Sequence, residues 1–253
     1  MNEQTLWTWL LYGWFGLAAV TFLVLQFISA PYGRHIRKGW GWVIPSRLGW
    51  ILMELPAVAV PLLCFWFSSR QNNPVLLVFL GLWLFHYVQR TFVYPFRMRM
   101  DGKTMPVLIA ALAFCTNVGI DYLNFRYFFH FGPVYTTAWL TDPRFLLGSA
   151  LFFAGFFINV QSDTILRDLR KPGETGYKIP YGGAYRWVSC PNYFGEILEW
   201  TGFAIATWSL PALAFLLWTM SNLTPRALEN HRWYQETFDE YPTERKALLP
   251  FLL

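Results

Sequence analysis

A carboxylate lies where a buried or membrane-spanning segment is expected. Glu54 stands inside the apolar run 48–67, which also contains Pro56 and Pro61. An ionisable group at such depth is costly, so Glu54 is a functional candidate that is protonated, hydrogen-bonded or paired. A simple hydrogen bond between helices is the alternative explanation. The two prolines free backbone carbonyls and can bend the segment around a cavity.

A second group of polar side chains ends the apolar run 74–88. Tyr87, Arg90 and Tyr94 are spaced i, i+3 and i+7, which places them on one face of a helix. A tyrosine hydroxyl near a buried Glu54 makes a donor pair suited to polarising a carbonyl oxygen. The alternative is an interfacial cluster whose polar ends reach toward water. The spacing is compatible with both.

Polar residues also extend from the fifth apolar run. Asn159, Asp163, Arg167 and Arg170 are four, four and three residues apart and so form one helical stripe. A solvated helix end explains the two arginines better than the two deeper residues. The basic, Gly- and Pro-rich segment 170–183 follows, and its backbone amides and cations can approach phosphates. It is neither a GxGxxG turn nor a Walker A loop, which excludes a Rossmann site.

Two acids, Glu196 and Glu199, stand at the entry to the last apolar stretch. Pro191 suits the first turn of a helix there. Acids entering an apolar helix are hard to explain as lipid-facing, and they suit a hydroxyl- or amide-bearing ligand such as a ribose or a nicotinamide. The segment 230–242 forms an amphipathic tail, which we interpret mainly as a helix lying on the membrane surface.

The elements that position these residues are expected to be helices in a membrane. Of 253 residues, 55% are apolar and only 14% are charged, and the mean hydropathy is +0.31. Aromatic residues reach 20%, which suits interfacial belts and flat pockets for a lipophilic ligand. The net charge of +5 is spread between apolar runs, which argues against a nucleic-acid partner. The widely spaced Cys64, Cys115 and Cys190 are predicted to be packing residues.

Five apolar runs can span a bilayer, and they cover 7–30, 48–67, 74–88, 106–125 and 145–160. The stretch 197–223 is ambiguous because Pro211 disfavours helix at the preceding residue. A break there gives seven spans and places 17 of the 20 basic residues on one side. Lys and Arg concentrate in cytoplasmic loops. We therefore predict an all-α protein with seven transmembrane helices, the N-terminus outside and the tail cytoplasmic. The first run is expected to be a retained helix, and a bacterial inner membrane or an endoplasmic-reticulum membrane would fit.

Taken together, these stretches resemble the steroid 5-alpha-reductase family. The similarity runs from about residue 45 to the C-terminus and is strongest after residue 140. The motifs that carry it are Glu54 followed by Leu55-Pro56, His86-Tyr87 followed by 90–94, the stretch 159–167, the strings 169–174 and 177–180, Asn192 with 195–196 and 199–200, the string 206–215, and 241–242 with 245–247.

The resemblance implies a seven-helix membrane reductase that uses NADPH to reduce an enone and needs no metal. It implies that Glu54 and Tyr87 hydrogen-bond the 3-oxo group of a Δ4-3-oxosteroid such as testosterone or progesterone. The residues it assigns to the cofactor are Arg90, Asn159, Asp163, Arg167, Arg170, Tyr177, Lys178, Asn192, Glu196 and Tyr234. The expected apolar walls of the substrate pocket are Trp50, Phe114 and Trp200.

Two departures from the family pattern affect the phosphate contacts. Lys178 stands where relatives often have arginine, which would weaken a bidentate contact. The segment 96–105 aligns poorly, so the resemblance does not choose among Arg97, Arg99 and Lys103 for the cofactor phosphates.

We expect one integral membrane domain over 1–253, with 1–104 forming much of the substrate pocket and 105–253 the NADPH site. Its partners would be a lipophilic steroid and the lipid bilayer, with no obligate protein partner. A membrane methyltransferase of the isoprenylcysteine or phospholipid type is the main alternative, against which Glu54 and Tyr87 argue. A non-enzymatic sterol-binding protein would not require the stripe that begins at Asn159. Another enone lipid, such as a sterol or polyprenol derivative, is an alternative substrate.

Overall fold

The computed structural model describes residues 1–28, 41–100, 102–170, 174 and 176–253. Parts of the predicted basic loops, including Arg34, Arg37, Lys38 and 171–173, lie outside the described residues. The chain forms two compact units. Among the described residues, the first comprises 1–14 and 41–143, and the second comprises 15–28 and 144–253.

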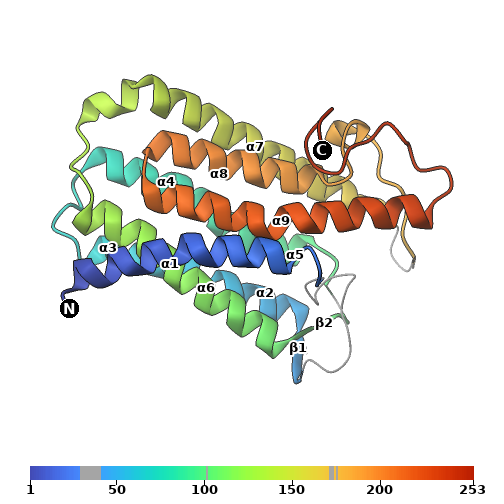
Figure 1. Cartoon of the computed structure of the whole chain (residues 1–253), viewed down its shortest axis with the longest axis horizontal. Helices are drawn as coiled ribbons and strands as arrows, with labels where there is room; N and C mark the ends of the chain where they lie inside the picture. The colour runs from blue at the N-terminus through green and yellow to red at the C-terminus, as the bar shows by residue number, and fades with distance from the viewer. Residues whose placement is uncertain (29–40, 101, 171–173, 175) are drawn as a thin grey trace. The chain divides into compact units, whose positions relative to one another are not determined.

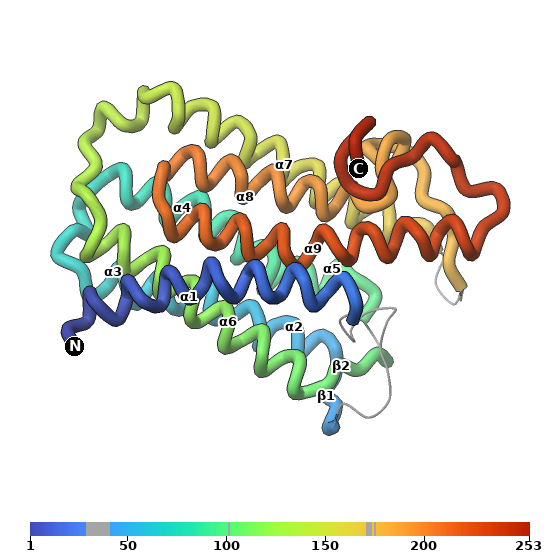
Figure 2. Tube along the Cα trace, viewed as in Figure 1, coloured from blue at the N-terminus to red at the C-terminus, as the bar shows by residue number. Residues whose placement is uncertain are grey.

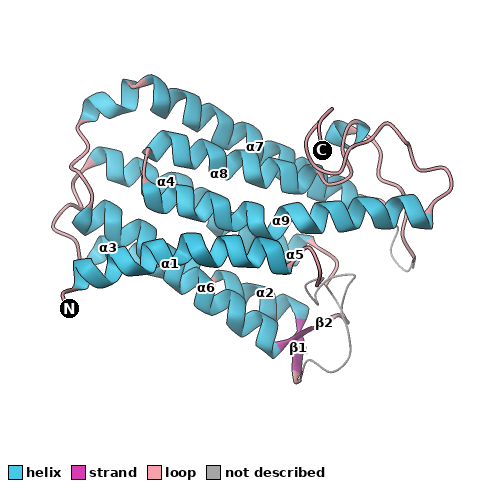
Figure 3. Cartoon of the chain, in the orientation of Figure 1, coloured by secondary structure: helices cyan, strands magenta, loops and turns pink. Residues whose placement is uncertain are grey.

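Helices make up most of the described structure, with one short two-stranded ribbon (Figure 3). Helix α1 (Glu3–Val24) contributes to both units. The other elements of the first unit are β1 (Val43–Pro45), α2 (Ser46–Glu54), α3 (Pro56–Trp66), α4 (Pro74–Val88), η2 (Gln89–Val93), α5 (Tyr94–Arg97), β2 (Thr104–Pro106), α6 (Val107–Arg126), η3 (Tyr127–Phe131) and η4 (Thr137–Thr141). Those of the second unit are α7 (Pro143–Asp168), η5 (Gly183–Arg186), α8 (Pro191–Thr207) and α9 (Leu210–Thr237).

The ribbon fixes where two helices of the first unit begin. Strands β1 and β2 are antiparallel, with Ile44 opposite Met105. Helix α2 follows β1 directly and helix α6 follows β2 directly, so both helices start at the ribbon (Figure 1). Farther along, the side-chain amide of Asn117 on α6 donates a hydrogen bond to the carbonyl of Met53 on α2 (2.7 Å). The position of Glu54, the next residue, is therefore tied to α6.

Prolines divide the second apolar run as its sequence suggests. Pro56 starts α3 immediately after Leu55, and Pro61 lies inside α3. Because Pro61 has no N–H, the carbonyl of Ala57 loses its usual helical donor. The indole Nε1 of the buried Trp83 donates to that carbonyl instead (2.9 Å). This hydrogen bond joins α3 to α4 at the position that Pro61 leaves without a helical donor.

Two π-helical turns alter the expected helical periodicity. The third apolar run does not end at Val88, because the helix continues through η2 and α5 to Arg97. A π-helical turn leaves carbonyls without their usual partners. At η3, side chains of the loop before α4 donate to such carbonyls. The Ser68 hydroxyl donates to Phe129 O (2.7 Å), and Arg70 donates to Gly132 O, just after η3 (2.8 Å).

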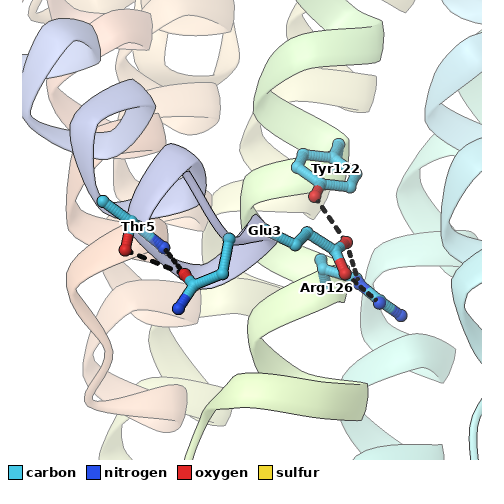
Figure 4. A network of polar contacts seen from close by, with 5 residues as sticks. Glu3, Thr5, Tyr122 and Arg126 are labelled. Atoms are coloured by element: carbon cyan, nitrogen blue, oxygen red, sulfur yellow. Dashed lines mark hydrogen bonds and ion pairs between the residues drawn. The ribbon is translucent and has the colours of Figure 1, made fainter.

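A polar network joins the first turn of α1 to the last turns of α6 (Figure 4). The carboxylate of Glu3 accepts hydrogen bonds from the Tyr122 hydroxyl (2.8 Å) and from Arg126 Nε and Nη2 (2.7 and 2.6 Å). Nearby, the indole of Trp7 donates to Leu123 O (3.1 Å). These contacts fasten the N-terminal part of α1 to the first unit.

In the second unit the predicted break near Pro211 is confirmed. Helix α8 ends at Thr207, Trp208 adopts a left-handed conformation (φ 46°), and α9 starts at Leu210 with the Ser209 side chain as its N-cap. Helices α7, α8 and α9 run side by side (Figure 2). Their core is aromatic, and Trp200 packs against Phe215 with ring centroids 4.7 Å apart.

Within the part of the chain that the structure describes, five helical segments are long and apolar enough to cross a membrane, which makes this a multi-pass membrane protein. They are Glu3–Val24, Ser46–Trp66, Pro74–Arg97, Val107–Phe131 and Pro143–Asp168. The helix predicted over 230–242 is confirmed up to Thr237 and is wrong for the residues that follow. Residues up to Thr237 belong to α9, and the segment after it is not helical. Its residues Tyr241, Arg245 and Leu248 are buried, because they pack within the second unit.

Candidate active site

Three contacts join the segment around Glu54 to the segment around Tyr87. Trp50 Nε1 donates to Arg90 O (3.1 Å). The hydroxyl of the buried Thr91 lies 3.4 Å from Glu54 O, and Trp83 Nε1 binds Ala57 O, as described above. Glu54 and Tyr87 therefore lie on facing stretches of chain, between the first contact and the last.

Tyr87 is held in place by its neighbours. Its side chain is only 5% exposed. The ring packs against Trp83 at a centroid distance of 5.0 Å and edge-on against His86 at 4.9 Å. A tyrosine whose ring is fixed in this way keeps its hydroxyl in a defined position, which is what a stabiliser of developing negative charge requires.

The structure also brings Arg90 and Tyr94 together, as their spacing predicted. The Arg90 guanidinium lies 4.3 Å from the Tyr94 ring centroid and 4.9 Å from that of Trp50. The two rings are themselves 4.9 Å apart. Arg90 thus occupies an aromatic corner formed by α2, η2 and α5, where a cation is stabilised by the ring faces.

Asp121 is a buried acid that the sequence interpretation did not single out. It lies on α6 one turn after Asn117 and has no exposed surface. Within the described part of the chain, neither of its carboxylate oxygens receives a hydrogen bond. Asp121 interacts electrostatically with Glu54. The sequence does carry a signal for Asp121, because an acid inside the apolar run 106–125 is as unusual as Glu54 inside the run 48–67.

We expect Asp121→Leu to raise the thermal stability of the detergent-solubilised protein. Removing a buried polar group that lacks a hydrogen bond relieves a desolvation cost of about 1–3 kcal/mol. Asn117→Leu is the matched control one turn earlier, and it should lower stability because Met53 O loses its donor. Thermal unfolding of both variants checks this, and an Asp121→Leu variant that melts below the parent would show that the carboxyl group is stabilising.

In the second unit, four predicted polar residues form one connected network between α7 and α8. The Asn159 amide donates to Asn192 O (2.9 Å) and lies 3.4 Å from Glu196 Oε2. The Asn192 amide donates to Asp163 Oδ1 (3.1 Å). Asn159 and Asp163 are buried. Amide and carboxylate groups gathered in this way can hydrogen-bond hydroxyl and carboxamide groups of a ligand.

Glycines allow this network to form, because they let the two helix backbones touch. A Cβ on Gly195 would lie 2.6 Å from both Asn159 N and Gly155 O, and a Cβ on Gly155 would collide with the backbone of Gly195 and Glu199. Two turns along, Gly148 and Gly202 repeat the arrangement. Close backbone approach of this kind requires residues without side chains.

The basic residues at the end of α7 and in the segment after it bind different partners. Arg170 donates to Gly176 O (3.2 Å), and its guanidinium lies 5.8 Å from the Tyr177 ring. Lys178 is bound to Glu174 (2.6 Å). Arg167 forms a two-point ion pair with the exposed Asp168, and the structure does not join it to the Asn159 network through any described hydrogen bond.

The remaining predicted residues lie in different surroundings. Tyr234 is 3% exposed and stacks on Tyr241, so it is part of an aromatic cluster with Ile179. Trp200 is buried in the core of the second unit, which already explains its presence by packing. Phe114 on α6 is 40% exposed. The assignment of Trp200 and Phe114 to a substrate pocket stays a prediction.

Apolar helices that carry buried polar clusters are typical of a membrane enzyme. The family profile described as 3-oxo-5-alpha-steroid 4-dehydrogenase matches residues 103–253. Relatives named 3-oxo-5-alpha-steroid 4-dehydrogenase 1 include that of Mus musculus, 48% identical over 240 residues, with 94% of this chain and 93% of the relative covered. That of Bos taurus is 45% identical over 243 residues, with 94% and 93% covered.

Similarity extends to plants, because steroid 5-alpha-reductase DET2 of Gossypium hirsutum is 41% identical over 255 residues, with 99% of each chain covered. These matches define the class of the protein as a membrane oxidoreductase. The chain belongs to the 3-oxo-5-alpha-steroid 4-dehydrogenase, or steroid 5-alpha-reductase, family. The resemblance drawn from the motifs is confirmed.

Proposed function

We propose that this protein uses NADPH to reduce the C4–C5 double bond of Δ4-3-oxosteroids and yields 5α-reduced 3-oxosteroids. Relatives that are 41–48% identical carry the names of steroid 5-alpha-reductases. The observation that carries the proposal is the buried Tyr87, fixed by Trp83 and His86 on the stretch of chain that faces Glu54. A tyrosine hydroxyl held in this way can donate a hydrogen bond to a ketone oxygen.

The reaction adds a hydride to C5 and a proton to C4 of the steroid. Negative charge develops on the 3-oxo oxygen as the hydride arrives at C5, and the intermediate on the substrate is an enolate with its double bond between C3 and C4, which the proton at C4 then converts to the ketone. The Tyr87 hydroxyl, oriented by Glu54, would donate a hydrogen bond to that oxygen. Because the bond strengthens as charge develops in a dry site, it would contribute about 3 kcal/mol to transition-state stabilisation.

The residues of the second unit fit the cofactor. The carboxylate and amide groups of Asn159, Asp163, Asn192 and Glu196 match the hydroxyl and carboxamide groups of a ribose and a nicotinamide. Arg170 beside Tyr177 would hold a phosphate, with Arg167, Lys178 and Arg90 as further cations. NADPH, when bound, supplies the hydride. The chain's own contribution is to fix the ring that faces the steroid and so set the stereochemistry.

The arrangement in the membrane is part of the proposal. Five helical segments are apolar enough to span, and α8 and the first part of α9 would supply two more. Seven spans place most basic residues on the cytoplasmic side. The N-terminal part of the chain would then form much of the steroid pocket, and the part after residue 104 would bind NADPH.

Turnover of a steroid by the purified protein tests the proposal. We expect NADPH oxidation in detergent with testosterone or progesterone, a product two hydrogens heavier by mass spectrometry, and a preference for NADPH over NADH. NADPH binding without turnover of these steroids would redirect the proposal to another enone lipid. A folded protein that does not bind NADPH would contradict it and favour a membrane methyltransferase.

A further inference from the structure

A short hydrogen-bonded chain in the second unit is not used by the proposed reaction. The Ser189 hydroxyl oxygen lies 2.5 Å from His231 Nδ1 and 2.6 Å from the Tyr241 hydroxyl. Ser189 and Tyr241 are 3% and 5% exposed, and His231 is half-buried. Buried polar groups joined by such short contacts hold their surroundings in one geometry.

Each member of the chain is attached to a segment that carries a proposed cofactor residue. Ser189 stands three residues before Asn192, and its N–H donates to Lys246 O (2.8 Å). His231 is three residues before Tyr234 on α9. The Tyr241 ring stacks on that of Tyr234 with centroids 5.2 Å apart.

Arg245 extends the same assembly to the loop after α7. Its Nη1 donates to Pro180 O (3.0 Å), close to Tyr177 in sequence. Its guanidinium lies 4.9 Å from the ring centroid of Tyr181 and 5.2 Å from that of Tyr241. The loop, the start of α8, the end of α9 and the tail are therefore held by one assembly.

A neutral His231 with its ring proton on Nε2 can accept the Ser189 proton at Nδ1, and the Ser189 oxygen can accept a hydrogen bond from the Tyr241 hydroxyl. A protonated His231 carries a proton on Nδ1 and cannot accept from Ser189. Protonation therefore changes the hydrogen bond between Ser189 and His231.

The surroundings of His231 favour the neutral ring. Burial, and then the nearby Lys246, lower the pKa of His231 below its usual 6.5. Burial raises the pKa of Tyr241, although the Ser189 hydroxyl and the positive charge of Arg245 oppose that shift. The charged and titratable groups around the chain are Lys246, Arg245 and Tyr241 from the tail and Cys190 from the start of α8. Because the folded-state pKa is lowered, this stabilisation is complete above pH 6.5, the usual pKa, and is lost as the pH falls from there through the lowered pKa of the folded protein.

We propose that Ser189, His231 and Tyr241 are positioning residues that hold the cofactor-binding residues of the second unit in place, and that they do so only while His231 is neutral. The inference rests on the proposed NADPH site. It predicts that these residues affect cofactor affinity much more than the rate of the chemical step, and that their effect depends on pH.

The test measures NADPH affinity of the detergent-purified protein by tryptophan fluorescence between pH 5.5 and 8, together with kcat at saturating NADPH. Tyr241→Phe keeps the stacked ring and removes the hydroxyl, and Tyr181→Phe is its control. His231→Asn keeps an acceptor near the Nδ1 position and does not titrate. Because the NADPH phosphate itself titrates near pH 6, the informative quantity is the ratio of the two affinities, parent to His231→Asn, at each pH.

We expect Tyr241→Phe and Ser189→Ala to raise the Kd for NADPH about three- to tenfold at pH 7.5, with kcat nearly unchanged and Tyr181→Phe like the parent. The parent should lose affinity relative to His231→Asn as the pH falls below 6.5. Thermal unfolding verifies that each variant is folded. A parent that binds NADPH, with variants that bind it equally and a ratio independent of pH, would overturn this inference alone. A parent that never binds NADPH would overturn the proposed function and this inference together.

Discussion

Replacing Tyr87 by phenylalanine is expected to lower kcat for a Δ4-3-oxosteroid about 10²–10³-fold, which is the usual effect of removing one donor to a developing oxyanion. The ring would stay where it is, because Trp83 and His86 hold it and the side chain is buried. The loss should therefore come from the missing hydroxyl and not from a rearranged pocket. Steady-state kinetics with saturating NADPH measures it.

Glu54→Gln tests the other half of the same pair. Glutamine preserves the size of the side chain but cannot hold a charge or a carboxyl proton, so it should impair the orientation of Tyr87 and reduce kcat as well. Tyr94→Phe is the matched control, since Tyr94 contacts the Arg90 guanidinium through its ring face and phenylalanine keeps that face. Near-normal turnover by both Tyr87→Phe and Glu54→Gln, with NADPH bound, would refute the catalytic assignment.

Gly155→Ala is expected to destabilise the second unit strongly. The added Cβ would collide with the backbone of Gly195 and Glu199, and backbone atoms cannot rotate away as side chains do. Helices α7 and α8 would have to separate, at a cost of about 3 kcal/mol or more. Asn159 lies one turn beyond this contact, so its hydrogen bond to Asn192 should be lost as well.

Thermal unfolding and NADPH affinity together measure this effect. We expect a sharply lower melting temperature and weak cofactor binding for Gly155→Ala. Gly81→Ala is the matched control, because Gly81 is also helical but a Cβ there meets nothing within 4 Å. That change should be neutral or slightly stabilising, since alanine favours a helix by about 1 kcal/mol over glycine. Equal behaviour of the two variants would show that the backbone contact between α7 and α8 is not tight.

The sequence alone determined the class of fold and the chemistry available to it. Apolar runs long enough for a bilayer predicted the helices, and Pro211 predicted the break between α8 and α9 correctly. These are local properties, since a helix and its interruption depend on neighbouring residues. Polar residues inside apolar runs, such as Glu54 and Asn159, could be recognised as functional candidates from the sequence, because burial of such groups is costly.

Only the tertiary structure decided which groups meet. The Trp83 indole replaces the donor that Pro61 removes from Ala57, across 26 residues of chain. The Ser189 hydroxyl meets His231 and Tyr241 across 42 and 52 residues. No helical spacing encodes such pairs, because they depend on how helices pack. The sequence predicted helix as far as Tyr94 but not the π-helical turn η2 within it.

The tail shows the limit of local patterns most clearly. Its aromatic and charged residues were interpreted as a surface helix, since an amphipathic composition is typical of one. In the structure, Tyr241 and Arg245 are buried and hold the loop that ends at Pro180. Composition indicates that such side chains can cover an apolar surface, but the surface they cover is created by distant parts of the chain.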